Sequence, residues 1–277
     1  MLPNLATLRS HVELSLAGRI ASPFGYRNRK SVETALTGIP EIDSLAGGFP
    51  RGALTEICGP PCSGRTTVLL SALASRTAQA EVCALIDARD SFDPRSAKAA
   101  GVELQQLLWV RCRNLDQSLR AADLLIQGGG FGFIALDLSD IAPETVRHVP
   151  LNAWFRFRRA VEDTSTVLLV LEQESNAKTC ASLVLQMKMK SAHWSATVNT
   201  DSPGISPQPY ACLLDGSEVL VELLHTRMQS INLPQARNGP VSIAGSSTGH
   251  GSDNTQSFEA QSMWSYLHAM PVEAKLK

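Results

Sequence analysis

Between about residue 35 and residue 235, short apolar runs alternate with stretches of helical spacing. The apolar runs predict strands over 53–58, 82–87, 132–137 and 166–172. The helical spacing predicts helices over 65–76, 116–127 and 151–162. This alternation is typical of an α/β fold in which a mainly parallel central sheet is covered by helices on both faces.

From residue 182 onward the pattern changes to strand after strand. Asp215 and Gly216 form an Asp-Gly pair between apolar runs, which favours a hairpin turn. The end of the core is therefore predicted to be an antiparallel C-terminal extension of the sheet.

The segments on either side of the core, which spans 35–235, differ from it in composition. Residues 1–34 have apolar side chains at helical spacing, so we expect an N-terminal helical segment that packs on the core or on a partner. Residues 236–257 are rich in Gly, Ser, Asn and Thr and are predicted to be a flexible linker. Residues 258–277 begin with an apolar stripe at helical spacing, which favours a C-terminal interaction segment. The stripe could equally fold back on its own domain.

The chain has 277 residues, 44% of them hydrophobic, and a formal net charge of −1. It can bury a full core but lacks the basic surplus of a strong nucleic-acid binder. It has no apolar run of about 18 residues, and its start lacks the regions of a secretory signal. We therefore expect a cytoplasmic protein with no membrane association. Its six cysteines form no C-x-x-C pair, which favours small buried hydrophobes in a reducing compartment.

Residues 59–66 read Gly-Pro-Pro-Cys-Ser-Gly-Arg-Thr. They match the phosphate-binding pattern G-x-x-x-x-G-K-[ST], except that Arg65 replaces the lysine. The loop lies between a predicted strand and a predicted helix, so backbone N–H groups and the helix dipole would favour a phosphate. A chance glycine loop is the alternative. The candidate nucleotide-binding residues here are Gly59, Pro60, Pro61, Cys62, Ser63, Gly64, Arg65, Thr66 and Thr67.

The arginine changes what this loop is expected to do. Arg65 could pair with a phosphate, but its planar fork differs in shape from the compact ammonium that lysine brings to the β- and γ-phosphates. We therefore expect nucleotide binding with poor stabilisation of the transition state.

A second candidate site residue, Asp137, ends an apolar run. In phosphate-loop proteins such a carboxylate holds Mg²⁺ together with the loop Ser or Thr hydroxyl. Asp137 and Thr66 are thus the candidate Mg²⁺ ligands. An aspartate that follows a strand is also a common helix cap.

With three further stretches, these motifs make the chain resemble the RecA-type recombinase superfamily over roughly residues 35–235. The stretches are similar to the family's lead-in to the loop, its second strand and its late hairpin, over 37–52, 85–94 and 216–227. The resemblance implies a RecA-like P-loop fold that binds ATP with Mg²⁺. It also implies that Gln173, at the end of the fourth strand, senses the γ-phosphate.

The chain also departs from the family's pattern. Arg89 stands where the family has the glutamate that orients the attacking water, and a cation cannot act as that base. His225 and Arg227 stand where the family has two lysines that reach the γ-phosphate of the neighbouring subunit. The family's long DNA-binding loop is largely missing, because residues 174–178 run almost directly into the next apolar stretch.

These departures predict a RecA-like accessory factor in bacterial DNA repair, similar to the ImuA-type factor of SOS translesion mutagenesis. It would bind nucleotide with little or no hydrolysis, so no enzymatic turnover is expected. It would act as a monomer or small oligomer through a protein partner, either a polymerase-like mutagenesis factor or a recombinase. Two alternatives stay open: an active DNA-dependent ATPase that assembles on single-stranded DNA, and a nucleotide-free module that regulates a true recombinase.

One local basic cluster could bind single-stranded DNA weakly, through backbone contacts and base stacking, near the family's first DNA-contacting loop. The alternative is an amphipathic helix that packs its aromatic side chains into the core. The cluster comprises Arg147, His148, Arg156, Arg158 and Arg159, interleaved with Trp154, Phe155 and Phe157.

Overall fold

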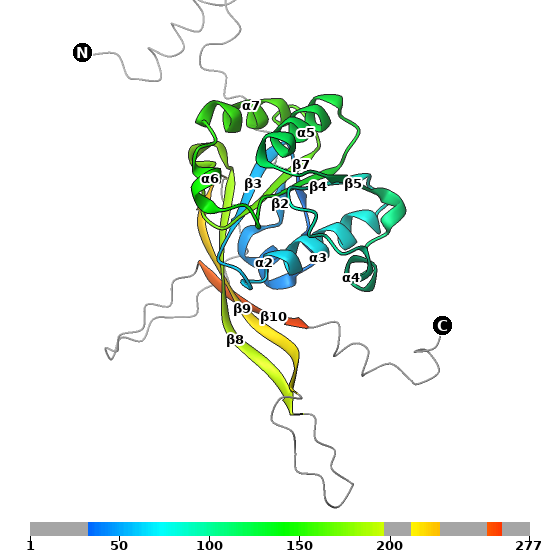
Figure 1. The fold of residues 1–277 in the computed structure, drawn as a ribbon, viewed down its shortest axis with the longest axis vertical. Helices are drawn as coiled ribbons and strands as arrows, with labels where there is room; N and C mark the ends of the chain where they lie inside the picture. Colours follow the sequence, from blue (N-terminus) through cyan, green and yellow to red (C-terminus); the bar gives the residue numbers. More distant parts are fainter. Residues whose placement is uncertain (1–32, 197–211, 228–253, 262–277) are drawn as a thin grey trace, which may run out of the picture. The chain divides into compact units, whose positions relative to one another are not determined.

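The computed structural model describes residues 33–196, 212–227 and 254–261. An eight-stranded mixed sheet forms its centre (Figure 1). The strands are β3 (Ala53–Cys58), β4 (Cys83–Asp87), β5 (Leu107–Arg111), β6 (Phe133–Asp137), β7 (Val167–Glu172), β8 (Leu183–Ala196), β9 (Cys212–Thr226) and β10 (Thr255–Gln261). A separate two-stranded ribbon is formed by β1 (Thr34–Ala35) and β2 (Phe49–Pro50).

Across the large sheet the strand order is β10-β9-β8-β3-β7-β6-β4-β5. All neighbours from β8 to β5 pair in parallel, whereas β9 pairs antiparallel with both β8 and β10. The predicted α/β fold, with a mainly parallel sheet and an antiparallel C-terminal extension, is confirmed.

Helices cover both faces of this sheet. They are α2 (Pro40–Ala46), α3 (Arg65–Thr77), α4 (Pro94–Ala99), α5 (Leu115–Gly128), α6 (Pro143–Arg147) and α7 (Leu151–Val161), with 3-10 turns η1 (Leu104–Gln106) and η2 (Lys178–Cys180). Figure 1 shows α5 and α7 along one face and α2 and α3 along the other. The strands and helices predicted between residues 53 and 172 are confirmed. Within the described ranges, no helix is long and apolar enough to cross a membrane.

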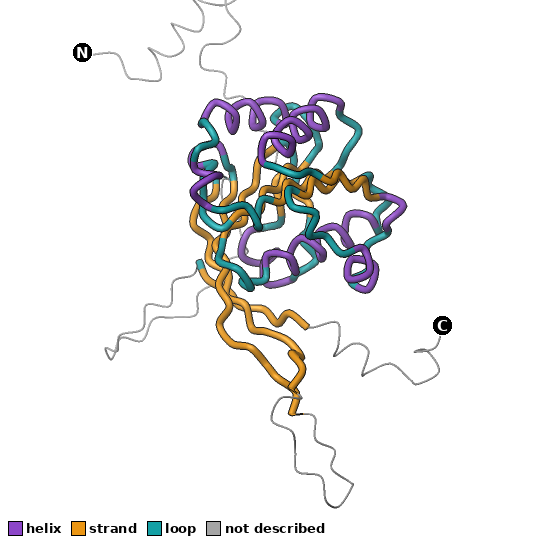
Figure 2. The backbone as a smooth tube through the Cα atoms, in the orientation of Figure 1, coloured by secondary structure: helices purple, strands orange, loops and turns teal. Residues whose placement is uncertain are grey.

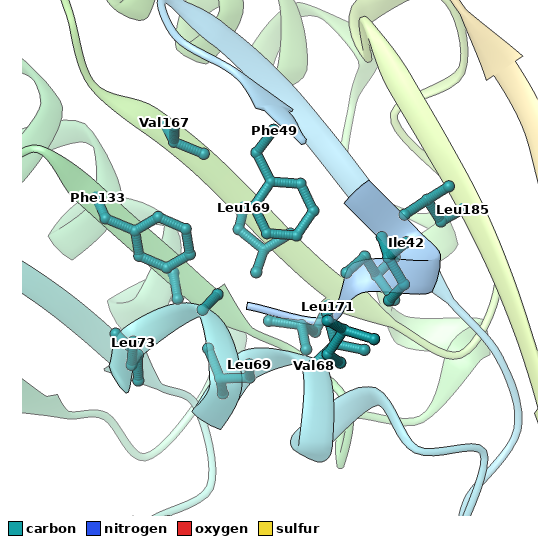
Figure 3. Packing of buried hydrophobic residues seen from close by; sticks show 14 of the residues in the cluster. Ile42, Phe49, Val68, Leu69, Leu73, Phe133, Val167, Leu169, Leu171 and Leu185 are labelled. Atoms are coloured by element: carbon teal, nitrogen blue, oxygen red, sulfur yellow. The ribbon is translucent and has the colours of Figure 1, made fainter. Parts of the chain in front are cut away.

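The buried strands supply two hydrophobic cores, because successive side chains of a strand point to opposite faces. In β7, Leu169 and Leu171 join the cluster under α2 and α3, which Figure 3 shows from close by. Leu168 and Val170 join the cluster under α5 and α7. Every residue of β7 is buried, as expected for a central parallel strand covered on both faces.

The predicted hairpin turn at Asp215 and Gly216 is wrong, because both residues lie inside β9. The pairing register shifts there: His193 lies opposite Gly216, while Trp194 lies opposite Leu214. The Asp-Gly pair therefore marks a β-bulge within a long ribbon, a position at which glycine is common. Figure 2 shows β8 and β9 running together beyond the helical layers.

The prediction for the C-terminal region is also wrong in part. The expected linker ended at residue 257 and the expected helical stripe began at Phe258, yet β10 crosses this boundary. Phe258 and Ala260 are buried while Glu259 between them is exposed, which is the two-residue alternation of a strand rather than helical spacing. The remainder of the predicted linker, interaction segment and N-terminal segment lies outside the described residues, apart from residues 33 and 34.

Candidate nucleotide-binding site

The phosphate loop lies where the sequence places it, between the end of β3 at Cys58 and the start of α3 at Arg65. Gly64 is the N-cap of α3, with φ of 87°, and no side chain caps the helix. The first backbone N–H groups of a helix have no partner within the helix, so an uncapped N-terminus suits an anion.

Both loop glycines are required by close packing against the antiparallel strands. A Cβ atom on Gly59 would lie 2.3 Å from the carbonyl oxygen of Met187 on β8. A Cβ atom on Gly64 would lie 2.7 Å from Cγ2 of Val219 on β9, at a φ value that disfavours other residues. The loop is therefore shaped by β8 and β9 as well as by β3.

Arg65 is the most informative residue of the loop. It is 6% exposed, and its Nη1 is buried with no hydrogen-bond partner in the described structure. Burial lowers the pKa of Arg65, and Asp137 and Asp140 oppose that shift. Ser63 is 1% exposed, and its hydroxyl likewise has no partner among the described residues. An anionic oxygen would supply the acceptor that the guanidinium lacks, so these residues fit a bound phosphate.

Asp137 ends β6, at the same carboxyl edge of the sheet as the phosphate loop. Its carboxylate accepts a hydrogen bond from Ser139 N over 2.9 Å, and burial raises its pKa against the effect of that bond. The next helix, α6, has Ala142 as its N-cap, so the alternative reading of Asp137 as a helix cap is wrong. In the described residues no cluster of three or more His, Cys, Asp or Glu could hold a metal. A Mg²⁺ ion at Asp137 would therefore depend on Thr66 and on phosphate oxygens.

Comparison with known proteins agrees with this fold and loop. The model of the RecA N-terminal domain matches residues 10–147. The Cutibacterium acnes protein RecA is 35% identical over 135 residues, which cover 48% of this chain and 39% of that protein. The Acinetobacter baumannii protein RecA is 34% identical over 130 residues, 46% of this chain and 37% of that protein. The core of this chain has a RecA-like α/β fold and is similar in sequence to the RecA N-terminal domain. The chain matches about two fifths of the length of these curated relatives.

Two further predicted positions of the RecA-type pattern lie at the same edge of the sheet. Gln173 directly follows β7, and its Nε2 donates to the carbonyl oxygen of Ser139 over 3.0 Å. Arg89 lies just beyond β4 and is exposed. The neighbouring Asp87 is buried and accepts hydrogen bonds from the backbone N–H groups of Arg89, Ser91 and Phe92. That carboxylate therefore closes the turn after β4.

His225 and Arg227, which stand where the family has two lysines that reach the γ-phosphate of the neighbouring subunit, lie at the end of β9 and directly after it. His225 pairs with Val184 of β8, and the backbone N–H of Arg227 donates to Ser182 O over 2.8 Å. Both side chains are exposed. They are therefore accessible, and they are not part of the loop that carries Arg65.

The basic cluster is largely an amphipathic helix. Trp154 and Phe157 of α7 are buried, which confirms the structural reading for these two aromatics, whereas Phe155 is exposed. Two of the arginines form ion pairs: Arg147 with Glu174, and Arg156 with Asp123 over 2.9 Å.

Sequence reasoning missed two buried acids close to the predicted site. Glu56 lies in the middle of β3 and Glu172 ends β7, one residue before Gln173. Both are almost fully buried. The available signal was an ionisable residue inside, or at the end of, an otherwise apolar strand.

Proposed function

We propose that this chain is a RecA-like accessory protein of bacterial DNA repair and recombination that binds ATP with Mg²⁺ and hydrolyses it slowly or not at all. The observation that carries the proposal is the buried guanidinium of Arg65 with an unpartnered Nη1 at the N-terminus of α3. A buried cation with an open donor is costly unless an anion binds there. The similarity to the RecA proteins supports a nucleoside triphosphate as that anion.

Each residue of the site has a distinct part in this proposal. The backbone of residues 59–67 and the Arg65 side chain hold the phosphates, while Thr66 and Asp137 are the residues that would hold Mg²⁺. Mg²⁺ would neutralise phosphate charge when bound. Gln173, fixed to Ser139 O, lies at the edge of the sheet where it could contact the terminal phosphate.

The residues at the end of β4 are the reason we expect slow ATP hydrolysis. Arg89 offers a cation where a water-orienting carboxylate is needed. Its neighbour Asp87 accepts hydrogen bonds from three backbone N–H groups and from Trp109 Nε1, and Asp90 is paired with Arg111. These two carboxylates are therefore held in structural contacts.

DNA contact would be weak and partner binding would dominate. Only ten residues, 173–182, join β7 to β8, so the segment that follows Gln173 is short. A cavity of about 540 Å³ lies between this segment and the start of α7, lined in part by Arg147, His148, Lys178 and Glu174. The ion pair between Glu174 and Arg147 offsets part of its positive charge. We infer a cytoplasmic monomer or small oligomer, similar to the ImuA-type factor, that acts through a polymerase-like mutagenesis factor or through a recombinase.

The test measures ATP binding and ATP turnover separately. We expect Mg²⁺-dependent ATP binding and a hydrolysis rate near background, with and without single-stranded DNA. Neither Arg65→Lys nor Arg89→Glu alone should raise turnover, whereas the double variant should raise it, because the lysine and the water-orienting carboxylate act on different parts of the reaction. DNA-stimulated turnover in the unmodified chain would instead identify an active ATPase. Absence of ATP binding would identify a nucleotide-free interaction module.

A further inference from the structure

Two glutamates are buried side by side beneath the segment that follows β7. Glu56 is fully buried and Glu172 is 1% exposed. Their strands are adjacent and parallel, with Cys58 opposite Glu172, so the two glutamate side chains leave the same face of the sheet. Asn176 contacts both carboxyl groups: its backbone N donates to Glu56 Oε1 over 2.6 Å and its Nδ2 donates to Glu172 Oε2 over 2.8 Å.

Glu56 accepts three hydrogen bonds from the short segment that follows Gln173. Ser175 Oγ donates over 2.6 Å, Asn176 N over 2.6 Å and Ala177 N over 3.0 Å. An ionised carboxylate only accepts hydrogen bonds, so three converging donors suit a charged Glu56. The contact joins residues 119 to 121 positions apart in the sequence.

Glu172 has the opposite environment. Its Oε2 accepts a hydrogen bond from Asn176 Nδ2 over 2.8 Å, while its Oε1 is buried with no hydrogen-bond partner among the described residues. Burial raises the pKa of Glu172 well above its ordinary value, and Glu56 raises it further. Two buried carboxyl groups that share the partner Asn176 cannot both be ionised without a large cost, so the pair holds one proton.

The groups around the pair leave it without a counter-ion. Among the described ion pairs, none involves either glutamate. Burial raises the pKa of the neighbouring thiols of Cys58 and Cys180, so these stay neutral at physiological pH. The cations that act electrostatically on those two thiols are Arg65, Arg158 and Arg227.

We propose that Glu56 and Glu172 form a proton-dependent anchor, which holds residues 173–177 against β3 for as long as the two carboxyl groups share one proton. The anchor is a positioning device rather than a catalytic one. Glu56 lies three residues before Gly59, and Glu172 directly precedes Gln173. It therefore ties the residue expected to sense the terminal phosphate to the strand that leads into the phosphate loop. This link to nucleotide rests on the proposed function, whereas the anchoring itself does not.

The pH dependence follows from linkage. A carboxyl group whose pKa is raised by folding makes the folded state less stable as the pH rises from the ordinary carboxyl value to the raised one, and has no further effect above it. Local opening that releases one proton becomes easier by up to about tenfold per pH unit in that window. The segment after β7 should therefore lose protection as the pH rises.

The experiment is amide hydrogen exchange of the full chain between pH 5 and pH 9, expressed as protection factors of Asn176 and Ala177. In the unmodified protein these factors should fall by several-fold or more per pH unit. Glu172→Gln replaces the protonated acid by a neutral isostere of the same size that has no carboxyl proton to lose, so its protection should be at least as high at pH 7 and nearly independent of pH. Glu56→Gln should lower protection at every pH.

Glu174→Gln is the matched control, because Glu174 lies in the same segment but is exposed and paired with Arg147. It should keep the pH dependence of the unmodified protein. Equal pH profiles for the unmodified protein and Glu172→Gln would overturn the anchor, and the unmodified profile decides the matter even where Glu56→Gln does not fold. ATP–Mg²⁺ binding is measured in parallel. Loss of that binding throughout would overturn the proposed function while leaving the exchange result to judge the anchor.

Discussion

The two halves of the sheet contribute to the candidate site in different ways. The parallel half carries the residues that would contact nucleotide and Mg²⁺: the loop after β3, Asp137 at the end of β6 and Gln173 after β7. The antiparallel half, which comprises β8, β9 and β10, carries none of these candidate contacts. It nevertheless packs directly against the loop through Met187 of β8 and Val219 of β9.

One set of residues would therefore recognise the nucleotide, and a different set determines the shape of its site. Residues that recognise phosphate lie close together in sequence, since a loop and a helix N-terminus suffice. The residues that shape the loop, Met187 of β8 and Val219 of β9, lie far from it along the chain. A change in β8, β9 or β10 should therefore act through stability and loop geometry, and a change at Arg65 through affinity alone.

The largest effect is expected from Phe258→Ala in β10. Phe258 is 4% exposed and belongs to the core cluster under α2 and α3. Removing a buried phenyl ring should lower the free energy of unfolding by about 3–5 kcal/mol, measured by urea denaturation. Truncation before this residue should also destabilise the core, unlike removal of a tethered tail.

Leu124→Ala is the control for that change, because Leu124 on α5 is 72% exposed. Its effect should stay within about 0.5 kcal/mol. A Phe258→Ala variant as stable as the unmodified chain would mean that the antiparallel half does not support the core.

The same residue shows where prediction from sequence ended. Strands such as β7 were predictable because each is a continuous apolar run between turn residues. β10 was not, because its seven residues include polar side chains on the exposed face and follow a glycine- and serine-rich stretch. Its partner β9 lies earlier in the chain, and pairing between distant strands leaves no local signal.

The candidate site also contains residues that could be predicted from the sequence and residues that could not. The loop, Asp137 and Gln173 were predictable because each lies at the end of a predicted strand or directly after one, and strand ends meet at one edge of a parallel sheet. The pairing of Glu56 with Glu172 was not, since it depends on which strands are neighbours and on the course of the segment between β7 and β8. The bulge at Gly216 was misread because a turn and a bulge use the same residue types.

The second-largest effect tests how Arg65 recognises the nucleotide. Arg65→Ala removes the buried guanidinium, and a hydrogen bond to a charged group contributes about 1.5–3 kcal/mol. We expect ATP affinity to fall by about 10- to 100-fold, measured by calorimetry. Stability without nucleotide should not fall, because Nη1 of Arg65 has no partner in the described structure.

Arg120→Ala on the exposed side of α5 is the matched arginine control and should leave both quantities unchanged. A clear loss of stability in Arg65→Ala without any change in ATP affinity would show that the guanidinium has a structural role and no phosphate contact.

The third effect tests how the antiparallel half shapes the loop. Gly59→Ala places a methyl group 2.3 Å from Met187 O, so either the loop or β8 must shift. Overpacking of this kind costs about 1–3 kcal/mol, and ATP affinity should fall with it. Gly128→Ala is the control, because a Cβ atom there meets nothing within 4 Å. Equal ATP affinity and stability in both variants would mean that the loop does not depend on its contact with β8.

The smallest effect concerns single-stranded DNA, and its sign is more informative than its size. Glu174 holds Arg147 in an ion pair beside the cavity that Lys178 also lines. Glu174→Gln should release Arg147 and strengthen DNA binding slightly, whereas Arg147→Ala should weaken it, each by about 1 kcal/mol or less.

Binding is measured by fluorescence anisotropy at several salt concentrations, because each phosphate contact on a single strand contributes about 0.7 to the slope of log affinity against log salt. A shallow salt slope that becomes shallower still in Arg147→Ala would indicate that few phosphates are contacted and that they lie at this cavity. Tight binding at physiological salt that neither variant alters would place the DNA elsewhere and favour the active, filament-forming alternative.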